Sequence, residues 1–202
     1  MAARRESANP AARRRLLKAA AAFGVSPGWL PSSAQAHGSF GPVEPALAAP
    51  ALALQAMQGQ RVDFAALLHG RVTAVQLMFT GCSATCPIQG AMFAEAQQRL
   101  LRDDPRLRLL SISIDPLGDD LKAMQGWLAR FAADTSRWNA ALPRVQDVDR
   151  LLDFLRGRAT GIDRHTAQAF VFDRRARLVY RTEDMAAPTE LVRLLQRVNA
   201  RG

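Results

Sequence analysis

The sequence predicts an α/β fold in which a central mixed sheet is flanked by helices. Segments 71–79 and 106–115 are almost continuously apolar, as strands buried on both faces are. Each is followed by a segment with an apolar residue at every third or fourth position, which is the spacing of an amphipathic helix. Near the C-terminus, three residues separate the apolar segments 168–173 and 177–181, which predicts a hairpin.

The first elements surround the segment 71–79. Residues 51–71 predict two short strands around a turn at residues 58–60, and then a loop. The buried strand follows, and a helix then runs from Pro87 to about Leu101. Proline suits the first turn of a helix because its missing N–H would have no partner there. The apolar positions that repeat along this helix are Ile88, Met92, Ala96 and Leu100.

Two further helices follow the strand 106–115. The apolar positions of the first are Leu121, Met124, Leu128 and Phe131, and those of the second are Val148, Leu151, Leu152 and Leu155. Asp115, Asp119 and Asp120 precede the first of these helices, where helix capping explains them. After the hairpin, a last helix begins at residues 188–189. Strand, helix, strand, helix, hairpin and helix is the order of a thioredoxin-like domain.

Composition indicates one domain with a basic leader. The chain has 202 residues and a formal net charge of +9. Residues 1–36 hold six basic and one acidic side chain, so the rest of the chain carries 21 basic and 17 acidic residues, a charge of +4. Aromatic residues make up 6%, too few for base-stacking surfaces. We therefore expect no nucleic-acid partner, and we expect a monomer.

The leader 1–36 predicts an export signal. Arg13 to Lys18 is basic, Ala19 to Val25 is weakly apolar, and Ala34-Gln35-Ala36 offers a cleavage site before His37. The paired arginines and the short apolar run resemble a twin-arginine signal. Nowhere are there 18 consecutive apolar residues, so no transmembrane segment is expected. The prediction is a periplasmic domain of residues 37–202, in a compartment where disulfides form.

The chain's two cysteines, Cys82 and Cys86, stand in the turn between the strand 71–79 and the following helix. A helix N-terminus stabilises a thiolate, and the i, i+4 spacing places both sulfurs on one side of the helix. Three interpretations compete: a structural disulfide, a redox dithiol, or two thiolate ligands for a metal. A bridge across so small a loop would stabilise the fold little, which favours the other two.

A metal site needs a third ligand, and the histidines are His37, His69 and His165. His165 lies in the loop before the hairpin, and in a thioredoxin-like fold this loop faces the helix that follows the cysteines. Thioredoxins hold a proline there, but no proline occurs here between Pro143 and Pro188. We therefore expect His165, rather than the other two histidines, to complete a site.

These motifs together resemble the SCO/SenC family. Its features are a C-x-x-x-C-P motif after a strand, an Asp-Pro turn after the next strand and a distant histidine beside an aspartate. In this chain they are Cys82 to Pro87, Asp115-Pro116 and Asp163-Arg164-His165-Thr166. The family usually has the aspartate and histidine adjacent, whereas Arg164 separates them here. The resemblance covers roughly residues 45–200.

The resemblance implies a copper chaperone that assists assembly of cytochrome c oxidase. Its ligands would be Cys82, Cys86 and His165, and its partner an oxidase subunit or another copper protein. Two soft thiolates and an imidazole suit Cu(I), and Cu(II) is the alternative oxidation state. Zinc would accept the same ligands but usually takes a fourth. The alternative is an enzyme, a metal-free thiol-disulfide oxidoreductase or peroxiredoxin-like reductase in which the same two cysteines are catalytic.

Overall fold

An eight-stranded mixed sheet forms the centre of the computed structural model, which describes residues 39–100, 103–161 and 163–202. The strand order is β1-β8-β7-β4-β5-β6-β2-β3. β4, β5 and β6 run parallel, and the remaining neighbours pair antiparallel. The strands are β1 (Gly41–Ala48), β2 (Ala53–Ala56), β3 (Arg61–Asp63), β4 (Val72–Met78), β5 (Leu107–Ser113), β6 (Trp138–Pro143), β7 (Ala169–Phe172) and β8 (Arg177–Arg181).

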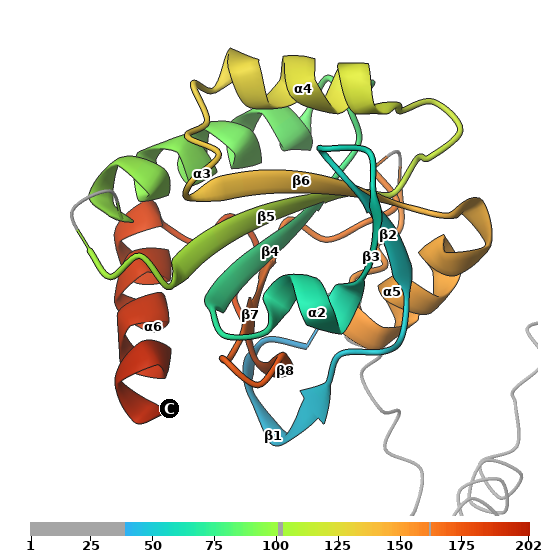
Figure 1. Cartoon of the computed structure of the whole chain (residues 1–202). Coiled ribbons are helices and arrows are strands. Elements are labelled where there is room, and N and C mark those ends of the chain that lie inside the picture. Colours follow the sequence, from blue (N-terminus) through green and yellow to red (C-terminus); the bar gives the residue numbers. More distant parts are fainter. Residues whose placement is uncertain (1–38, 101–102, 162) are drawn as a thin grey trace, which may run out of the picture. The chain divides into compact units, whose positions relative to one another are not determined.

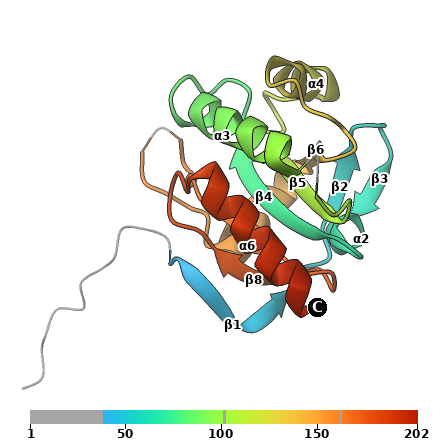
Figure 2. The same ribbon diagram turned by 90° about the vertical axis from the view of Figure 1, so that its left-hand side faces the viewer.

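Helices cover both faces of this sheet (Figure 1). One face packs against α3 (Thr85–Leu100), α4 (Leu121–Arg130) and α6 (Pro188–Arg201), and Figure 2 shows α3 and α6 lying along it together. The other face packs against α2 (Phe64–Leu68) and α5 (Val148–Leu155). A 3₁₀ turn, η1 (Val145–Asp147), leads into α5. The predicted fold class, a thioredoxin-like domain with a central mixed sheet flanked by helices, is confirmed.

The structure adds elements that the sequence pattern did not reveal. The segment before β4, predicted to be a loop, contains α2, whose first turn is capped by the carboxylate of Asp63 accepting from the N–H of Ala65. The strands β1 and β6 were not predicted either. The predicted export signal, residues 1–36, lies outside the described residues. No helix in the described ranges is long and apolar enough to cross a membrane.

The buried face of α3 agrees with the predicted one only in part. Ala96 and Leu100 are buried as predicted, whereas Ile88 is 57% exposed. Phe93 and two glutamines, Gln89 and Gln97, are buried instead. Each glutamine amide donates to a backbone carbonyl outside the helix. The side-chain oxygen of Gln97 also accepts from the N–H of Asp134 at 2.7 Å, whereas that of Gln89 has no partner among the described residues. The bonds to other segments allow these polar side chains to occupy core positions.

A buried hydrogen-bonded group joins the three parallel strands beneath α3. The hydroxyl of Ser111 on β5 accepts from the amide of Gln76 on β4 at 2.7 Å and from the indole N–H of Trp138 on β6 at 2.9 Å. All three side chains are nearly or completely buried. The parallel strands therefore have a polar connection inside an otherwise apolar layer.

The parallel register places two loops at one edge of the sheet. Met78, which ends β4, lies opposite Ser113, which ends β5. The chain after β4 carries the cysteines, and the chain after β5 carries the turn at Asp115–Asp119. The loops that follow neighbouring parallel strands meet at this edge, which is the usual location of a functional site in an open α/β sheet.

Candidate functional site

The loop between β4 and α3 is fixed by a buried carboxylate from the neighbouring loop. Asp119 accepts hydrogen bonds from the backbone N–H of Thr80 at 3.1 Å and from the Thr80 hydroxyl. Its second oxygen accepts from the hydroxyl of Ser113 at 2.6 Å. Helix capping was predicted for Asp115, Asp119 and Asp120. Of these, Asp120 caps α4, because its carboxylate accepts from the N–H of Ala123. Asp119 instead holds the backbone two residues before Cys82.

Both cysteines are buried and free. Helix α3 begins at Thr85, two residues earlier than predicted, so Cys86 lies in its first turn. The backbone N–H of Cys86 donates to the sulfur of Cys82 at 3.3 Å. The sulfur of Cys82 therefore accepts from one of the N–H groups that a helix leaves free at its N-terminus.

His165 faces Cys86 from the loop before β7. Its Nε2 atom lies 3.5 Å from the sulfur of Cys86. Its Nδ1 atom lies 2.9 Å from the carbonyl oxygen of Thr166. A carbonyl can only accept, so Nδ1 carries the proton and the lone pair of Nε2 is directed at the sulfur. This is the tautomer that a metal-binding histidine needs.

Packing holds this loop against the start of α3. The amide of Gln89 donates to the carbonyl of Gln168 at 3.2 Å. His165 pairs with Arg158 through a single β-bridge, and the N–H of Thr166 donates to the carbonyl of Gly157. These contacts fix the position of the imidazole before any ligand binds.

Burial keeps the thiol of Cys86 and the ring of His165 neutral. Burial is the largest cause that raises the pKa of Cys86, and its hydrogen bond with Cys82 raises it further. Burial also lowers the pKa of His165, against the opposing effect of its hydrogen bond with Thr166. Both charged forms lose hydration in the interior. At neutral pH the pair is consequently a thiol beside a neutral imidazole.

Asp163 contacts the other cysteine. Its carboxylate accepts from the thiol of Cys82 at 3.3 Å and from the hydroxyl of Thr85. The Thr85 hydrogen bond is the largest cause that lowers the pKa of Asp163. Arg164 has a φ of 54°, in the left-handed region. The turn at Arg164 allows Asp163 to reach Cys82 while His165 reaches Cys86.

The structure thus brings Cys82, Cys86 and His165 to one location. Within the described ranges, however, no three His, Cys, Asp or Glu side chains are arranged to hold a metal ion as they stand. Cys86 and His165 face one another, but the thiol of Cys82 donates a hydrogen bond to the carboxylate of Asp163. His69 is exposed at the end of α2, and His37 lies outside the described residues. The contacts of Asp119 and Asp163 with the cysteine loop were not predicted.

Comparison with known protein families identifies one that matches most of the chain. The model of the family SCO1/SenC matches residues 44–200. A curated relative, the SCO1 protein homolog of Bacillus subtilis (strain 168), is 27% identical over 85 residues. That alignment covers 42% of this chain and 44% of the relative, so it spans less than half of either protein.

Solved structures share the fold over most of their length. A SCO1/SenC family lipoprotein from Bacillus anthracis has a TM-score of 0.66 at 19% identity, covering 78% of this chain and 96% of that one. ScoI of Bradyrhizobium japonicum, solved with copper bound, has a TM-score of 0.60 at 21% identity, covering 79% and 98%. At these identities the likeness establishes the arrangement of strands and helices.

Proposed function

Because this chain belongs to the SCO1/SenC family, we propose that it is a copper-binding protein that carries one copper ion on Cys82, Cys86 and His165. It delivers the ion to a copper site of a cytochrome c oxidase subunit or of another copper protein. The observation that carries the proposal is the lone pair of His165 Nε2, directed at the buried sulfur of Cys86 at 3.5 Å.

The donor set favours copper over harder metals. Two thiolates and one imidazole are soft ligands that select Cu(I), and the same atoms can also bind Cu(II). Three protein ligands leave one side of the ion open, which suits an ion that has to be passed to another protein. Zinc would usually require a fourth ligand.

Loading requires one rearrangement at the site. The thiol of Cys82 bonds to Asp163 in this structure. It has to release the carboxylate and turn toward Cys86 and His165 to complete the three-ligand set. Both cysteines also have to lose their protons, so copper binding releases protons and strengthens as the pH rises.

Anaerobic copper titration of the reduced full-length chain tests the proposal. We expect one copper per chain, and we expect Cys82→Ser, Cys86→Ser and His165→Ala each to weaken binding sharply. His69→Ala is the matched control, because this histidine is exposed and precedes the start of β4, whereas the cysteines follow the end of that strand. Unchanged affinity in His165→Ala would remove histidine from the site and contradict the proposed ligand set.

A second candidate is a thiol-disulfide oxidoreductase that uses Cys82 and Cys86 without metal. It is favoured by two free cysteines at a helix N-terminus, where the backbone N–H of Cys86 donates to the sulfur of Cys82. In this reaction the dithiol becomes a disulfide while a disulfide of the partner becomes two thiols. Disulfide exchange needs no imidazole ligand, so reduction of a partner disulfide should survive in His165→Ala while copper binding is lost.

The proposed location is the periplasm, reached through the signal in residues 1–36. Export would place this chain in an oxidising compartment, where a partner's disulfides can form and are available for reduction. We propose that the exported domain acts as a monomer.

A further inference from the structure

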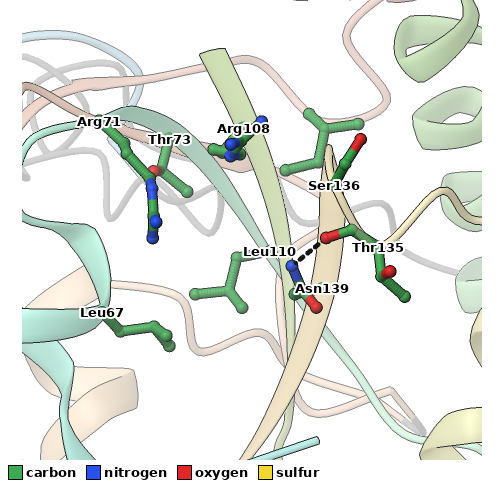
Figure 3. Close-up of a pocket in the computed structure, with 9 residues that line it drawn as sticks. Leu67, Arg71, Thr73, Arg108, Leu110, Thr135, Ser136 and Asn139 are labelled. Atoms are coloured by element: carbon green, nitrogen blue, oxygen red, sulfur yellow. Dashed lines mark hydrogen bonds between the residues drawn. The ribbon is translucent and has the colours of Figure 1, made fainter. Parts of the chain in front are cut away.

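A cavity of about 130 Å³, whose lining residues are drawn in Figure 3, lies where the parallel strands begin. The cysteines follow the opposite end of β4. Arg71 and Thr73 line it at the start of β4, Arg108 lines it from β5, and Asn139 from β6. Thr73 lies directly opposite Arg108 in the β4–β5 register. These side chains share the sheet face that α2 covers in part. The cavity is therefore separate from the site of Cys82 and Cys86.

Two guanidinium groups at this cavity have no compensating carboxylate contact. Arg71 and Arg108 form no ion pair within the described ranges. Arg108 is half-buried, and burial followed by repulsion from Arg71 and Arg137 lowers its pKa. Asp134 is the carboxylate that attracts Arg108 from this side, and it also accepts from the N–H of Ser136 at 2.8 Å. Three arginines against one aspartate leave an excess of positive charge.

A buried hydroxyl in the cavity wall also lacks a partner. Thr73 is 3% exposed, and its Oγ1 atom makes no hydrogen bond to any residue that the structure describes. Such a group costs free energy unless something binds it. Leu67 and Leu110 line the same cavity, so a ligand there would be partly shielded from water, which strengthens its attraction to the arginines.

Figure 3 shows these groups around a common space, with Leu67 and Arg71 on one side and Thr135, Ser136 and Asn139 on the other. The amide of Asn139 donates to the carbonyl of Thr135 at 2.6 Å, which holds this side of the cavity in place. The side-chain donors that remain are the guanidinium groups and the hydroxyls of Thr73, Thr135 and Ser136.

We propose that this cavity binds a small oxyanion of the phosphate class through Arg71, Arg108 and Thr73. The planar fork of a guanidinium matches the oxygens of a phosphate, and two such groups compensate its charge. The hydroxyl of Thr73 supplies a third donor from the floor. The cavity volume of about 130 Å³ admits free phosphate or the phosphate group of a small molecule, not a folded partner. The site is independent of the proposed copper function.

Calorimetric titration of the full-length chain with sodium phosphate tests this, with sodium chloride at equal ionic strength as the reference. We expect saturable binding of one phosphate per chain. Arg71→Ala and Arg108→Ala should each weaken it by at least about tenfold, since a hydrogen bond to a charged group is lost. Arg130→Ala is the control: this exposed arginine lies on α4, against the other face of the sheet, and should leave the affinity unchanged.

Thr73→Val separates a binding role from a structural one. Without phosphate, this variant should melt at a higher temperature than the original chain, because it removes a buried hydroxyl that has no partner. With phosphate, it should gain less stabilisation than the original chain. Equal stabilisation by phosphate in both proteins would contradict the role of the hydroxyl.

Two outcomes would overturn the proposal. One is a phosphate signal that does not saturate, or that persists in the Arg71→Ala, Arg108→Ala double variant, since either result describes general attraction to a basic protein. The other is sedimentation with phosphatidylglycerol vesicles that requires both arginines while free phosphate neither binds nor competes. That result would assign the arginines to a membrane surface instead of a small ligand.

Discussion

The sulfur of Cys86 and Nε2 of His165 lie 3.5 Å apart, although 79 residues separate them along the chain. The contact joins the first turn of α3 to the loop before β7. Because burial disfavours the charged form of each partner, the pair is stable as a thiol and a neutral imidazole. A fall in pH therefore acts on the site by protonating the imidazole, and a rise in pH acts on it by deprotonating the thiol.

His165 should make the copper-free, reduced protein sensitive to acid. Its folded pKa is lowered from the ordinary value of 6.5, so the unfolded chain takes up a proton first as the pH falls. The stabilisation is complete above about pH 6.5 and is lost as the pH falls toward the folded pKa, by at most about 1.4 kcal/mol per pH unit. Urea unfolding between pH 7.5 and 5 measures this. The slope should flatten in His165→Gln and persist in His69→Gln.

Cys86 should resist alkylation in the native protein. Its pKa is raised above the ordinary value of 9.0, and the thiolate is the reactive form. At pH 7.5, iodoacetamide should modify Cys86 at least about a hundredfold more slowly in the native chain than in urea, as followed by mass spectrometry in Cys82→Ser. The raised pKa also predicts stability that is present below pH 9 and is lost as the pH rises above it. Rapid native alkylation would show that the thiol is charged or exposed.

Asp119→Asn should destabilise the cysteine loop. The carboxylate accepts from Thr80 and Ser113, and an amide would turn one acceptor oxygen into a donor that faces other donors. We expect a loss of about 2–3 kcal/mol in unfolding free energy, together with weaker copper binding. The matched control is Asp120→Asn, since asparagine caps a helix about as well as aspartate. Equal stability of the two variants would show that Asp119 is only another capping residue.

Gly90→Ala should separate α3 from α4. A Cβ at Gly90 would lie 2.5 Å from the ring of Phe131 and 2.9 Å from that of Trp127. We expect destabilisation by about 1–3 kcal/mol, as for other overpacked cores. Gly126→Ala on α4 is the control, because a Cβ there would have no neighbour within 4 Å. It should stabilise the protein by up to about 1 kcal/mol, and thermal unfolding of both variants measures the contrast.

The export prediction is tested by the N-terminus of the mature protein. If the signal is cleaved after Ala36, N-terminal sequencing of the periplasmic protein should begin at or near His37. Changing both Arg13 and Arg14 to lysine should retain the protein in the cytoplasm if the twin-arginine route is used. An intact Met1 on cytoplasmic protein from the unaltered chain would contradict the location and the redox environment inferred from it.

Two of the three parallel strands, β4 and β5, were predictable because they are buried on both faces. The seven residues of β4 are all buried, and their mostly apolar sequence predicts such a strand. In contrast, β1 has two prolines and an irregular pairing with β8 at the edge of the sheet, where prolines are tolerated but make a strand hard to recognise. The five residues of α2 are too few to show a helical period.

The site was predictable only in part, because a sequence shows which groups are present and not which way they turn. The order of the elements correctly placed His165 near Cys86. The contact between Asp163 and Cys82 depends on the left-handed backbone of Arg164, an arginine being an unusual residue for that conformation. The buried face of α3 was mispredicted in part because Gln89 and Gln97 are polar, and only their partners on other segments explain their burial.

The hydroxyl of Ser111 has a consequence for how the chain selects its native alignment. Apolar side chains are interchangeable along a strand, so the layer beneath α3 would tolerate many pairings of β4, β5 and β6. Only the native pairing lets Gln76 and Trp138 both donate to Ser111. Sliding any one of the three strands would leave buried polar groups without partners, at a cost of about 1–3 kcal/mol for each. The hydrogen bonds to Ser111 therefore discriminate against misaligned sheets. By fixing the register of β4 and β5, they also bring the cysteine loop and the Asp119 loop to the same edge of the sheet, where the two loops can contact each other.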